Sequence, residues 1–172
     1  MGDIFYSNPV KLIFSIISAK EKYFLEAMQC LTNIFGNIDF ESQYQAFDFT
    51  DYYANEMGEN LQQKLISFEK LILPDRLSQI KINSNQLEFS ISPSDHLNKL
   101  TSKRKRKVNF DPGYITLSKF ILASTKNGPA RIYLKQGIYA EITLRFFKKS
   151  FHPLKWTYQN YQTELYIDFL NK

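Results

Sequence analysis

The chain has 172 residues, of which 44% are hydrophobic and 16% aromatic, and its formal net charge is +5. This length suits one domain with a substantial core, and the low glycine and proline contents argue against a disordered chain. The positive charge permits binding to nucleic acid, phosphate-bearing ligands or an anionic membrane without requiring any of them.

The location of the protein is indicated by what the sequence lacks. A single cysteine excludes an internal disulfide and suits a reducing compartment. No N-terminal leader and no long apolar segment is evident, so we expect neither export nor a membrane span. We therefore predict one cytoplasmic domain over residues 1–172.

A strand followed by a helix is predicted at the start of the chain. Residues 10–17 form a short apolar run, which is typical of a buried strand. Ser18 and Glu21 then have the spacing of a capping box. Apolar residues recur every three or four positions over 24–35, and Gly36 suits the end of the helix that they predict.

The middle of the chain is predicted to be more varied. Residues 38–50 and 61–71 read as extended segments. Pro74 and Asp75 mark a helix start, which an irregular helical pattern follows. Residues 93–106 are polar and charged, so we expect a mobile loop there.

The segment KVNFDPGYITLSKFIL, residues 107–122, predicts a turn and then a helix. Residues 111–113 form a turn signal, and Thr116 or Ser118 can cap a helix that follows. Lys119 would then lie in the first turn and oppose the helix dipole, at a cost of ~0.3–1 kcal/mol. A bound anion would remove this conflict, whereas solvent exposure would make it harmless. The glycines of a P-loop are absent.

The clearest hairpin lies at residues 131–145, where Gly137 suits a three-residue loop. Alternation places two groups of side chains on opposite faces of this hairpin. The apolar face is predicted to carry Ile132, Leu134, Ile138, Ala140, Ile142 and Leu144, and the polar face Arg131, Tyr133, Tyr139, Glu141, Thr143 and Arg145. A short helix is predicted near the C-terminus. Together the elements predict an α+β fold, a single-domain sandwich with a mixed or antiparallel sheet and helices packed on one face.

The acidic segment FDFTDYYANEMG, residues 47–58, has two interpretations. Asp48, Asp51 and Glu56 surround two tyrosines, and such carboxylates can bind a metal or act as a general base. Alternatively, Thr50 or Asp51 starts a short helix, whose first turn favours acids. Neither calcium-loop spacing nor a pair of histidines is present, so we predict no metal site.

The basic run at 103–107 also has two interpretations. It can be a solvated part of the polar loop, or its cations can contact nucleic-acid phosphates. No RNA- or DNA-binding motif accompanies it, so the second interpretation is the less favoured.

Three motifs together resemble a prokaryotic family known only as a domain of unknown function, number four-four-one-six. They are DYY-x-x-E-M-G, N-x-DPGY-x-T-x-SK and GIYAE-x-TL, and the resemblance extends over nearly the whole chain. It implies no assigned reaction. The residues on which the motifs place a candidate ligand site are Asp51, Tyr52, Tyr53, Glu56, Asn109, Asp111, Tyr114, Lys119, Tyr139 and Glu141.

Our leading hypothesis is a polar cleft that binds a small anionic, nucleotide-like ligand. A catalytic version would use Asp51, Asp111 or Glu141 as acid or base, with Lys119 stabilising negative charge. The alternatives are a nucleic-acid-binding module based on 103–107 and a non-catalytic assembly subunit with an aromatic interface. The sequence indicates no particular cofactor or oligomeric state, and it leaves enzymatic and binding roles open.

Overall fold

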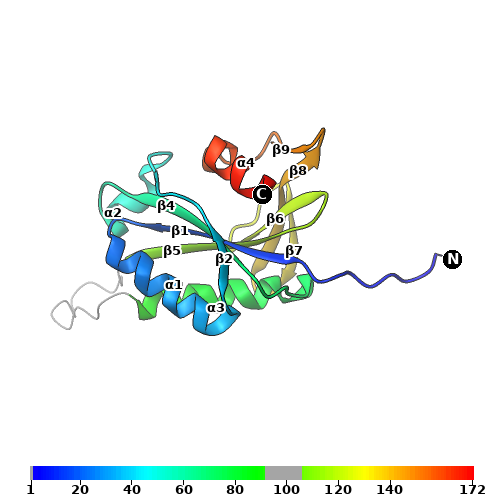
Figure 1. Cartoon of the computed structure of the whole chain (residues 1–172), viewed down its shortest axis with the longest axis horizontal. Coiled ribbons are helices and arrows are strands. Elements are labelled where there is room, and N and C mark those ends of the chain that lie inside the picture. The colour runs from blue at the N-terminus through cyan, green and yellow to red at the C-terminus, as the bar shows by residue number, and fades with distance from the viewer. Residues whose placement is uncertain (1, 92–105) are drawn as a thin grey trace.

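The computed structural model describes residues 2–91 and 106–172, which form an antiparallel sheet with helices on both faces (Figure 1). The strands in chain order are β1 (Lys11–Ser18), β2 (Ile38–Glu41), β3 (Gln45–Ala46), β4 (Gln62–Phe68), β5 (Val108–Ile115), β6 (Lys119–Ser124), β7 (Arg131–Lys135), β8 (Ile138–Phe147) and β9 (Ser150–Pro153). The helices are α1 (Glu21–Phe35), α2 (Ala54–Met57), α3 (Leu77–Ser90) and α4 (Glu164–Asn171), with 3-10 turns at Asp51–Tyr53, Pro74–Arg76 and Gln159–Gln162. The sheet order is β2-β4-β1-β5-β6-β8-β7, with β3 on β4 and β9 on β8.

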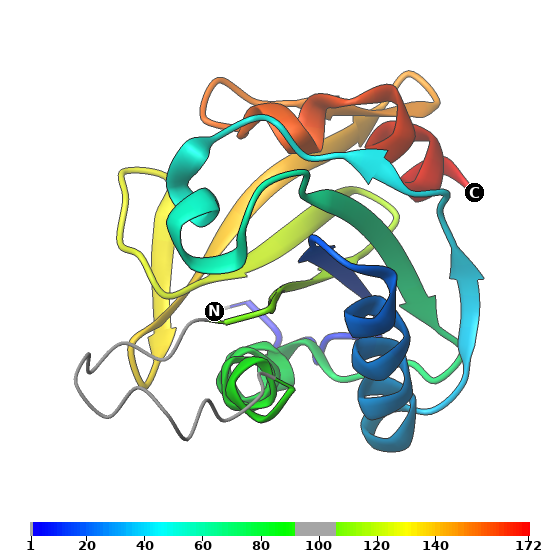
Figure 2. The ribbon, with the colours of Figure 1, turned by 90° about the vertical axis from the view of Figure 1, so that its left-hand side faces the viewer.

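Strand β1 lies at the centre of the core because nearly all of its side chains are buried. Leu12, Phe14 and Ile16 face α1 and α3, which cover the same side of the sheet (Figures 1 and 2). The predicted strand and helix are confirmed, and Gly36 ends α1 with a φ of 94°. The predicted capping box is wrong, because Lys20 and not Ser18 occupies the N-cap position of α1. The Ser18 hydroxyl instead donates to the carbonyl of Lys107 at 2.7 Å.

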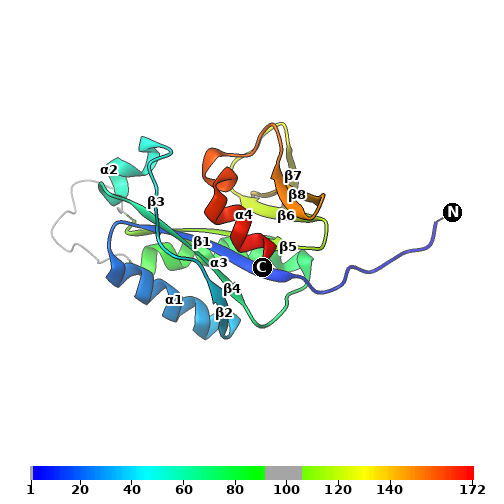
Figure 3. The same ribbon diagram turned by 45° about the horizontal axis from the view of Figure 1, so that its top comes forward.

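A second apolar cluster lies on the opposite face of the sheet, beneath α4 (Figure 3). Ile13 and Leu65 contribute to it from β1 and β4, and Tyr166 and Phe169 from α4. The predicted α+β class with an antiparallel sheet is confirmed. Helices α1 and α3 share one face as expected, whereas α4 covers the other.

The helix predicted after Thr116 is wrong, because this segment is the turn and second strand of a β-hairpin. The Thr116 hydroxyl accepts from the backbone N–H groups of Ser118 and Lys119, both at 3.2 Å, so it caps a turn. In β6, Phe120 and Leu122 face α4 while Ile121 and Ala123 face α3. Burial on both faces removes the polar alternation that would have identified a strand.

The turn predicted at residues 111–113 is also wrong, because these residues lie inside β5. Gly113 has a packing role there. A Cβ atom at this position would lie 2.5 Å from the carbonyl oxygen of Ile121 and 2.6 Å from the Phe120 ring. Gly113 therefore permits the close approach of β5 and β6, which is a common reason for glycine within a strand.

The hairpin of β7 and β8 is confirmed, but its turn and faces differ from the prediction. Gln136 and Gly137 form a two-residue turn with φ values of 53° and 77°. Ile132 is 69% exposed, whereas the side chains of Arg131 and Glu141 are buried. The register shifts between Tyr133 and Lys135 on this edge strand, so a simple alternation does not predict its exposed face.

The predicted mobile loop and most of the basic run lie outside the described residues. Only Arg106 and Lys107 of residues 93–107 belong to the part of the chain that the structure describes. Among the described helices, none is long and apolar enough to cross a membrane.

Candidate functional site

A split in the sheet creates the candidate site. Strands β5 and β6 pair only from Gly113 to Ile115, so residues 108–112 of β5 pair with β1 alone. Side chains of α3 replace the missing strand, because Glu88 accepts from the Phe110 N–H at 2.7 Å and Lys81 donates to the Phe110 carbonyl at 2.5 Å. Buried polar residues on α3 therefore satisfy backbone groups that would otherwise lack partners.

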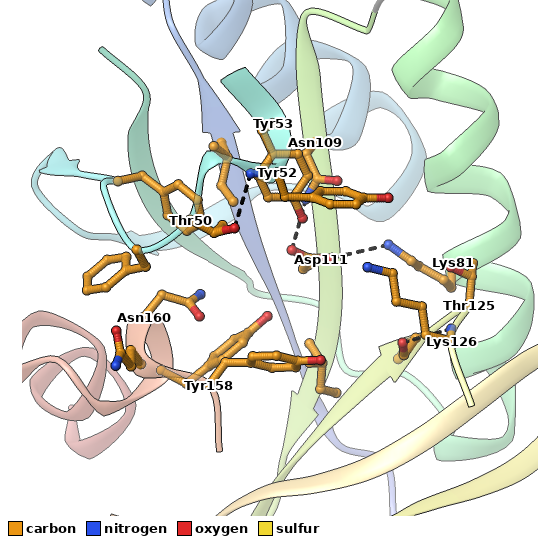
Figure 4. Close-up of a pocket in the computed structure, with 18 of the residues that line it drawn as sticks. Thr50, Tyr52, Tyr53, Lys81, Asn109, Asp111, Thr125, Lys126, Tyr158 and Asn160 are labelled. Atoms are coloured by element: carbon orange, nitrogen blue, oxygen red, sulfur yellow. Dashed lines mark hydrogen bonds and ion pairs between the residues drawn. The ribbon is translucent and has the colours of Figure 1, made fainter. Parts of the chain in front are cut away.

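A cavity of about 740 Å³ lies where β5 and β6 diverge. Its volume falls within the range of about 300–1,000 Å³ that is usual for small-molecule sites. Asn109 and Asp111 of β5 face it, and residues 124–126 line the side that follows β6. The other segments contribute the aromatic side chains Phe47, Phe49, Tyr52, Tyr53, Phe89, Trp156, Tyr158 and Tyr161. Figure 4 shows tyrosines on opposite walls of this cavity.

We call Asn109 and Asp111 of β5, with the α3 residues beside them, the floor of the cavity. Arg106 connects this floor to the wall that carries Tyr52 and Tyr53. Its guanidinium donates to both carboxylate oxygens of Glu56 at 2.8 Å, to Glu88 at 2.7 Å and to the Asn109 side-chain oxygen at 3.0 Å. We call Arg106, Glu56, Glu88 and Asn109 the Arg106 clamp. Two parallel bonds to one carboxylate are the strongest form of such a pair.

The two glutamates of the Arg106 clamp have pKa shifts of opposite sign. The hydrogen bonds from Arg106 hold the pKa of Glu56 below its usual range. Burial raises the pKa of Glu88, although the charges of Lys81 and Arg106 oppose this rise. The pKa of Arg106 is itself raised, chiefly by its hydrogen bonds to Glu56. The cation is therefore permanent in this network.

Arg131 links β7 to β8, to residues 124–126 and to Tyr158, and so holds the other wall of the cavity together. It donates to Glu141 at 2.7 Å, to the Ser124 hydroxyl and the Lys126 carbonyl at 2.9 Å, and to the Tyr158 hydroxyl at 3.3 Å. We call Arg131, Glu141, Ser124 and Tyr158 the Arg131 clamp. The Arg131 and Glu141 side chains are only 6% and 4% exposed, so this ion pair is buried. Burial opposes the Arg131 charge, but Glu141 raises the pKa of Arg131 overall.

Asp111 lies on the floor of the cavity, beside Asn109 of the Arg106 clamp. One of its oxygens pairs with Lys81 at 3.3 Å, and the other accepts from the Asn109 amide at 2.9 Å. Burial raises the pKa values of three tyrosines, and the nearby Asp111 carboxylate adds to each rise; they are Tyr53, Tyr161 and Tyr166. These tyrosines stay protonated, and Tyr53 and Tyr161 line the cavity, where their hydroxyls can donate hydrogen bonds.

Two lysines give the cavity its remaining positive charge. Lys81, Arg106 and Arg131 each have carboxylate partners. Lys126 and Lys155 also line the cavity, and neither pairs with a carboxylate among residues 2–91 and 106–172. The Lys126 ammonium lies 4.2 Å from the centre of the Tyr52 ring. The arrangement can therefore hold an anion beside exposed aromatic rings.

The structure brings four of the ten predicted ligand residues to the cavity, namely Tyr52, Tyr53, Asn109 and Asp111. Glu56 and Glu141 lie behind its walls, where they hold the two arginines.

The other four predicted residues lie elsewhere. Asp51 begins an exposed 3-10 turn, and Tyr114 packs near Leu77 and Ile121. Lys119 starts β6 opposite Arg145, and the Tyr139 ring contacts that of Tyr133. Lys119 begins a strand and not a helix, so no helix N-terminus favours an anion there.

The capping interpretation of the acidic segment is confirmed. The Thr50 hydroxyl accepts from the Tyr52 N–H at 3.1 Å and begins the 3-10 turn at Asp51–Tyr53. Within the described residues, no group of three or more His, Cys, Asp or Glu side chains is arranged to hold a metal ion.

The basic run has a partly structural role. Arg106 contacts Glu56 and Glu88 inside the protein and is not a solvated cation. Residues 103–105 lie outside the described residues, so the nucleic-acid hypothesis stays a prediction.

Sequence reasoning missed most of the charged residues that build the cavity. They are Lys81, Glu88, Arg106, Lys126, Arg131 and Lys155. A signal existed for two of them, because Lys81 and Glu88 have i, i+7 spacing on a helix and so share one face. Arg131 and Glu141 were predicted on a common polar face, but only Glu141 was named as a candidate ligand residue.

The comparisons with known proteins give one match. No curated protein and no solved structure matches the chain. The family model described as "Domain of unknown function (DUF4416)" matches residues 8–172, so the chain belongs to this family.

Proposed function

We propose that the protein binds a small anionic ligand with a planar aromatic part, such as a nucleotide, in the cavity between β5 and β6. The observation that carries this proposal is the placement of Lys126 and Lys155 on the cavity lining without carboxylate partners among the described residues. An anion is the ligand group that would compensate these charges. A neutral or cationic ligand would leave them uncompensated.

The aromatic part of the ligand is inferred from exposed rings on the same lining. Tyr52 and Tyr158 are 61% and 52% exposed, so both rings keep accessible surface for a ligand beside the cations that they contact, Lys126 and Arg131. Stacking of a base on such a ring contributes about 1–3 kcal/mol. Arg131 donates both to the Tyr158 hydroxyl and to the backbone carbonyl of Lys126. These two bonds hold the aromatic residue and the lysine in a fixed relation.

Binding can be measured by isothermal titration calorimetry and thermal unfolding of the full chain. The ligands are the four ribonucleoside 5′-monophosphates, the corresponding nucleosides and inorganic phosphate. We expect at least one monophosphate to bind more tightly than its nucleoside and to raise the melting temperature. Failure of every monophosphate to bind at millimolar concentration would overturn the proposal.

Variants assign the binding to this cavity. Lys126→Ala should weaken binding of the monophosphate about 10-fold or more, because it removes a charge-assisted hydrogen bond. Tyr158→Ala should weaken both the monophosphate and the nucleoside. Lys70→Ala is the matched control, because Lys70 is exposed, follows β4 and does not line the cavity. Equal losses in Lys126→Ala and Lys70→Ala would indicate only a non-specific effect of net charge.

A further inference from the structure

We propose that Asp111 accepts hydrogen bonds from two neighbouring hydroxyl groups of the ligand, so that the preferred ligand is a ribonucleotide with a free 2′,3′-diol. This inference rests on the proposed function and adds to it the identity of the sugar. It concerns Asp111, which among the described residues is the carboxylate on the cavity lining that holds neither arginine. Glu88 also lines the cavity but bonds to Arg106 and to the backbone of Phe110.

Asp111 is held rigidly and still has acceptor capacity. An ionised carboxylate can accept about four hydrogen bonds. Lys81 and Asn109 supply one each, and the Asp111 side chain is 21% exposed. Both partners are themselves fixed, because Lys81 also donates to the Phe110 carbonyl and the Asn109 oxygen accepts from Arg106. The carboxylate therefore presents unused lone pairs on the cavity lining in a fixed orientation.

The charge of Asp111 restricts which part of the ligand can approach it. A phosphate group would be repelled, whereas hydroxyl donors form short and strong bonds to a carboxylate. The two carboxylate oxygens can accept from two adjacent donors at once. A cis-diol supplies such a pair of donors and carries no charge of its own.

The position of Asp111 within the cavity favours the sugar as the source of these donors. In Figure 4, Lys81 and Lys126 lie on one side of Asp111, and Thr50 and Asn160 lie on the other. Tyr52 and Tyr158 lie on opposite walls. Lys126 on one side, Asp111 at the centre and the Tyr158 ring on the wall opposite Tyr52 can therefore meet the phosphate, the ribose and the base of a nucleotide, respectively.

The test compares sugars on the unmodified protein, so it needs no variant that could fail to fold. Calorimetry measures the binding of each ribonucleoside 5′-monophosphate and of its 2′-deoxy and 3′-deoxy analogues. We expect each deoxy analogue to bind about 10-fold more weakly or worse, since each loses one bond to a charged acceptor. Asp111→Asn should bind the ribonucleotide more weakly and should bind the ribo and deoxy forms with similar affinity.

The outcomes separate this inference from the proposed function. If nucleotides bind and the ribo and deoxy forms have equal affinity, the diol inference is wrong while the proposed function stands. If one base is preferred and Asp111→Asn abolishes only that preference, the donors belong to the base, and the inference is again overturned. If no nucleotide binds, both fail together.

Discussion

The Arg106 clamp and the Arg131 clamp hold opposite walls of one cavity, but they are built differently. Arg131 pairs with Glu141, ten residues away, directly across the β7–β8 hairpin. Arg106 pairs with Glu88 and Glu56, which are 18 and 50 residues away on separate elements. The ion pair of the first clamp is a local cross-strand pair, to which Ser124 and Tyr158 add neutral partners. The ion pairs of the second clamp join three segments that meet only in the folded protein.

This difference indicates which wall depends on the whole fold. The Arg131 pair needs only the hairpin, and a cross-strand pair is the usual unit of sheet stabilisation. The Arg106 clamp needs β5, α3 and the segment that carries Tyr52 to be in place together. We therefore expect the wall with Tyr52 and Tyr53 to be the more sensitive to substitution.

The largest effect is expected for Arg106→Met. It removes the cation that the buried Glu88 carboxylate and Glu56 share, so the free energy of unfolding should fall by about 5 kcal/mol, the upper end for a broken buried pair. Urea denaturation followed by Trp156 fluorescence measures the change. Arg145→Met is the control, since Arg145 is exposed and makes no ion pair among the described residues, and it should change stability by less than about 0.5 kcal/mol. Similar losses in the two variants would contradict the role of the clamp.

Arg131→Met should destabilise by about 3 kcal/mol, the lower end of the same range, because Thr143 still donates to Glu141. The double variant Arg131→Met/Glu141→Leu should recover most of this loss, since an apolar pair can replace a buried ion pair. The other Arg131 partners, on Ser124, Lys126 and Tyr158, belong to partly or fully exposed residues, so water can replace the arginine there. In contrast, Arg106→Met/Glu88→Leu should recover little, because the Phe110 N–H and Glu56 then lose partners. Double-mutant cycles measure both recoveries. Equal recovery in the two clamps would refute the distinction between them.

The pH dependence of stability tests whether Glu56 of the Arg106 clamp is ionised. Because the pKa of Glu56 is lowered in the folded state, its contribution is complete above the usual glutamate pKa of 4.5 and is lost as the pH falls through the lower folded value. Glu56→Gln should therefore cost about 1.5–3 kcal/mol near pH 7. The difference from the parent protein should shrink below pH 4.5. A difference that stays constant from pH 7 to pH 3 would show that Glu56 is not ionised in this role.

The smallest effect is expected for Thr50→Ala, which removes the cap of the turn that carries Tyr52. A lost cap costs about 0.5–2 kcal/mol, and the short turn here places the change near 0.5 kcal/mol. Thr50→Ser keeps the hydroxyl and should match the parent protein in thermal unfolding. A loss in Thr50→Ala as large as that in Arg106→Met would mean that the local turn, and not the clamp, holds this wall.

The elements that the sequence predicts well are those with one clear period. β1, α1, β4 and the β7–β8 hairpin follow from apolar runs or regular spacing together with turn residues. β6 does not, because Thr116 and Ser118 read as helix caps and the short apolar run after them fits a helix as well as a strand. Asp111 to Gly113 reads as a turn locally, although packing against Phe120 places it inside a strand.

The cavity is harder to predict than the fold because its charges are organised by distant contacts. Asn109 and Asp111 were identified, since they belong to N-x-DPGY-x-T-x-SK, one of the motifs on which the family resemblance rests. Arg106 could not be separated from the basic run that precedes it, because its partner Glu56 lies 50 residues away. Lys126 was missed because its role depends on the cavity and on the Tyr52 ring that it contacts. The spacing of residues around Lys126 in the sequence does not predict these contacts.

The substitution of α3 side chains for a strand has a consequence for association between molecules. An unpaired strand edge is a template on which another chain can add and aggregate. Lys81 and Glu88 occupy this internal edge of β5 at the carbonyl and N–H of Phe110. Helix α3 therefore blocks a surface on which copies of the chain could otherwise polymerise, at the same place where the sheet opens to form the cavity.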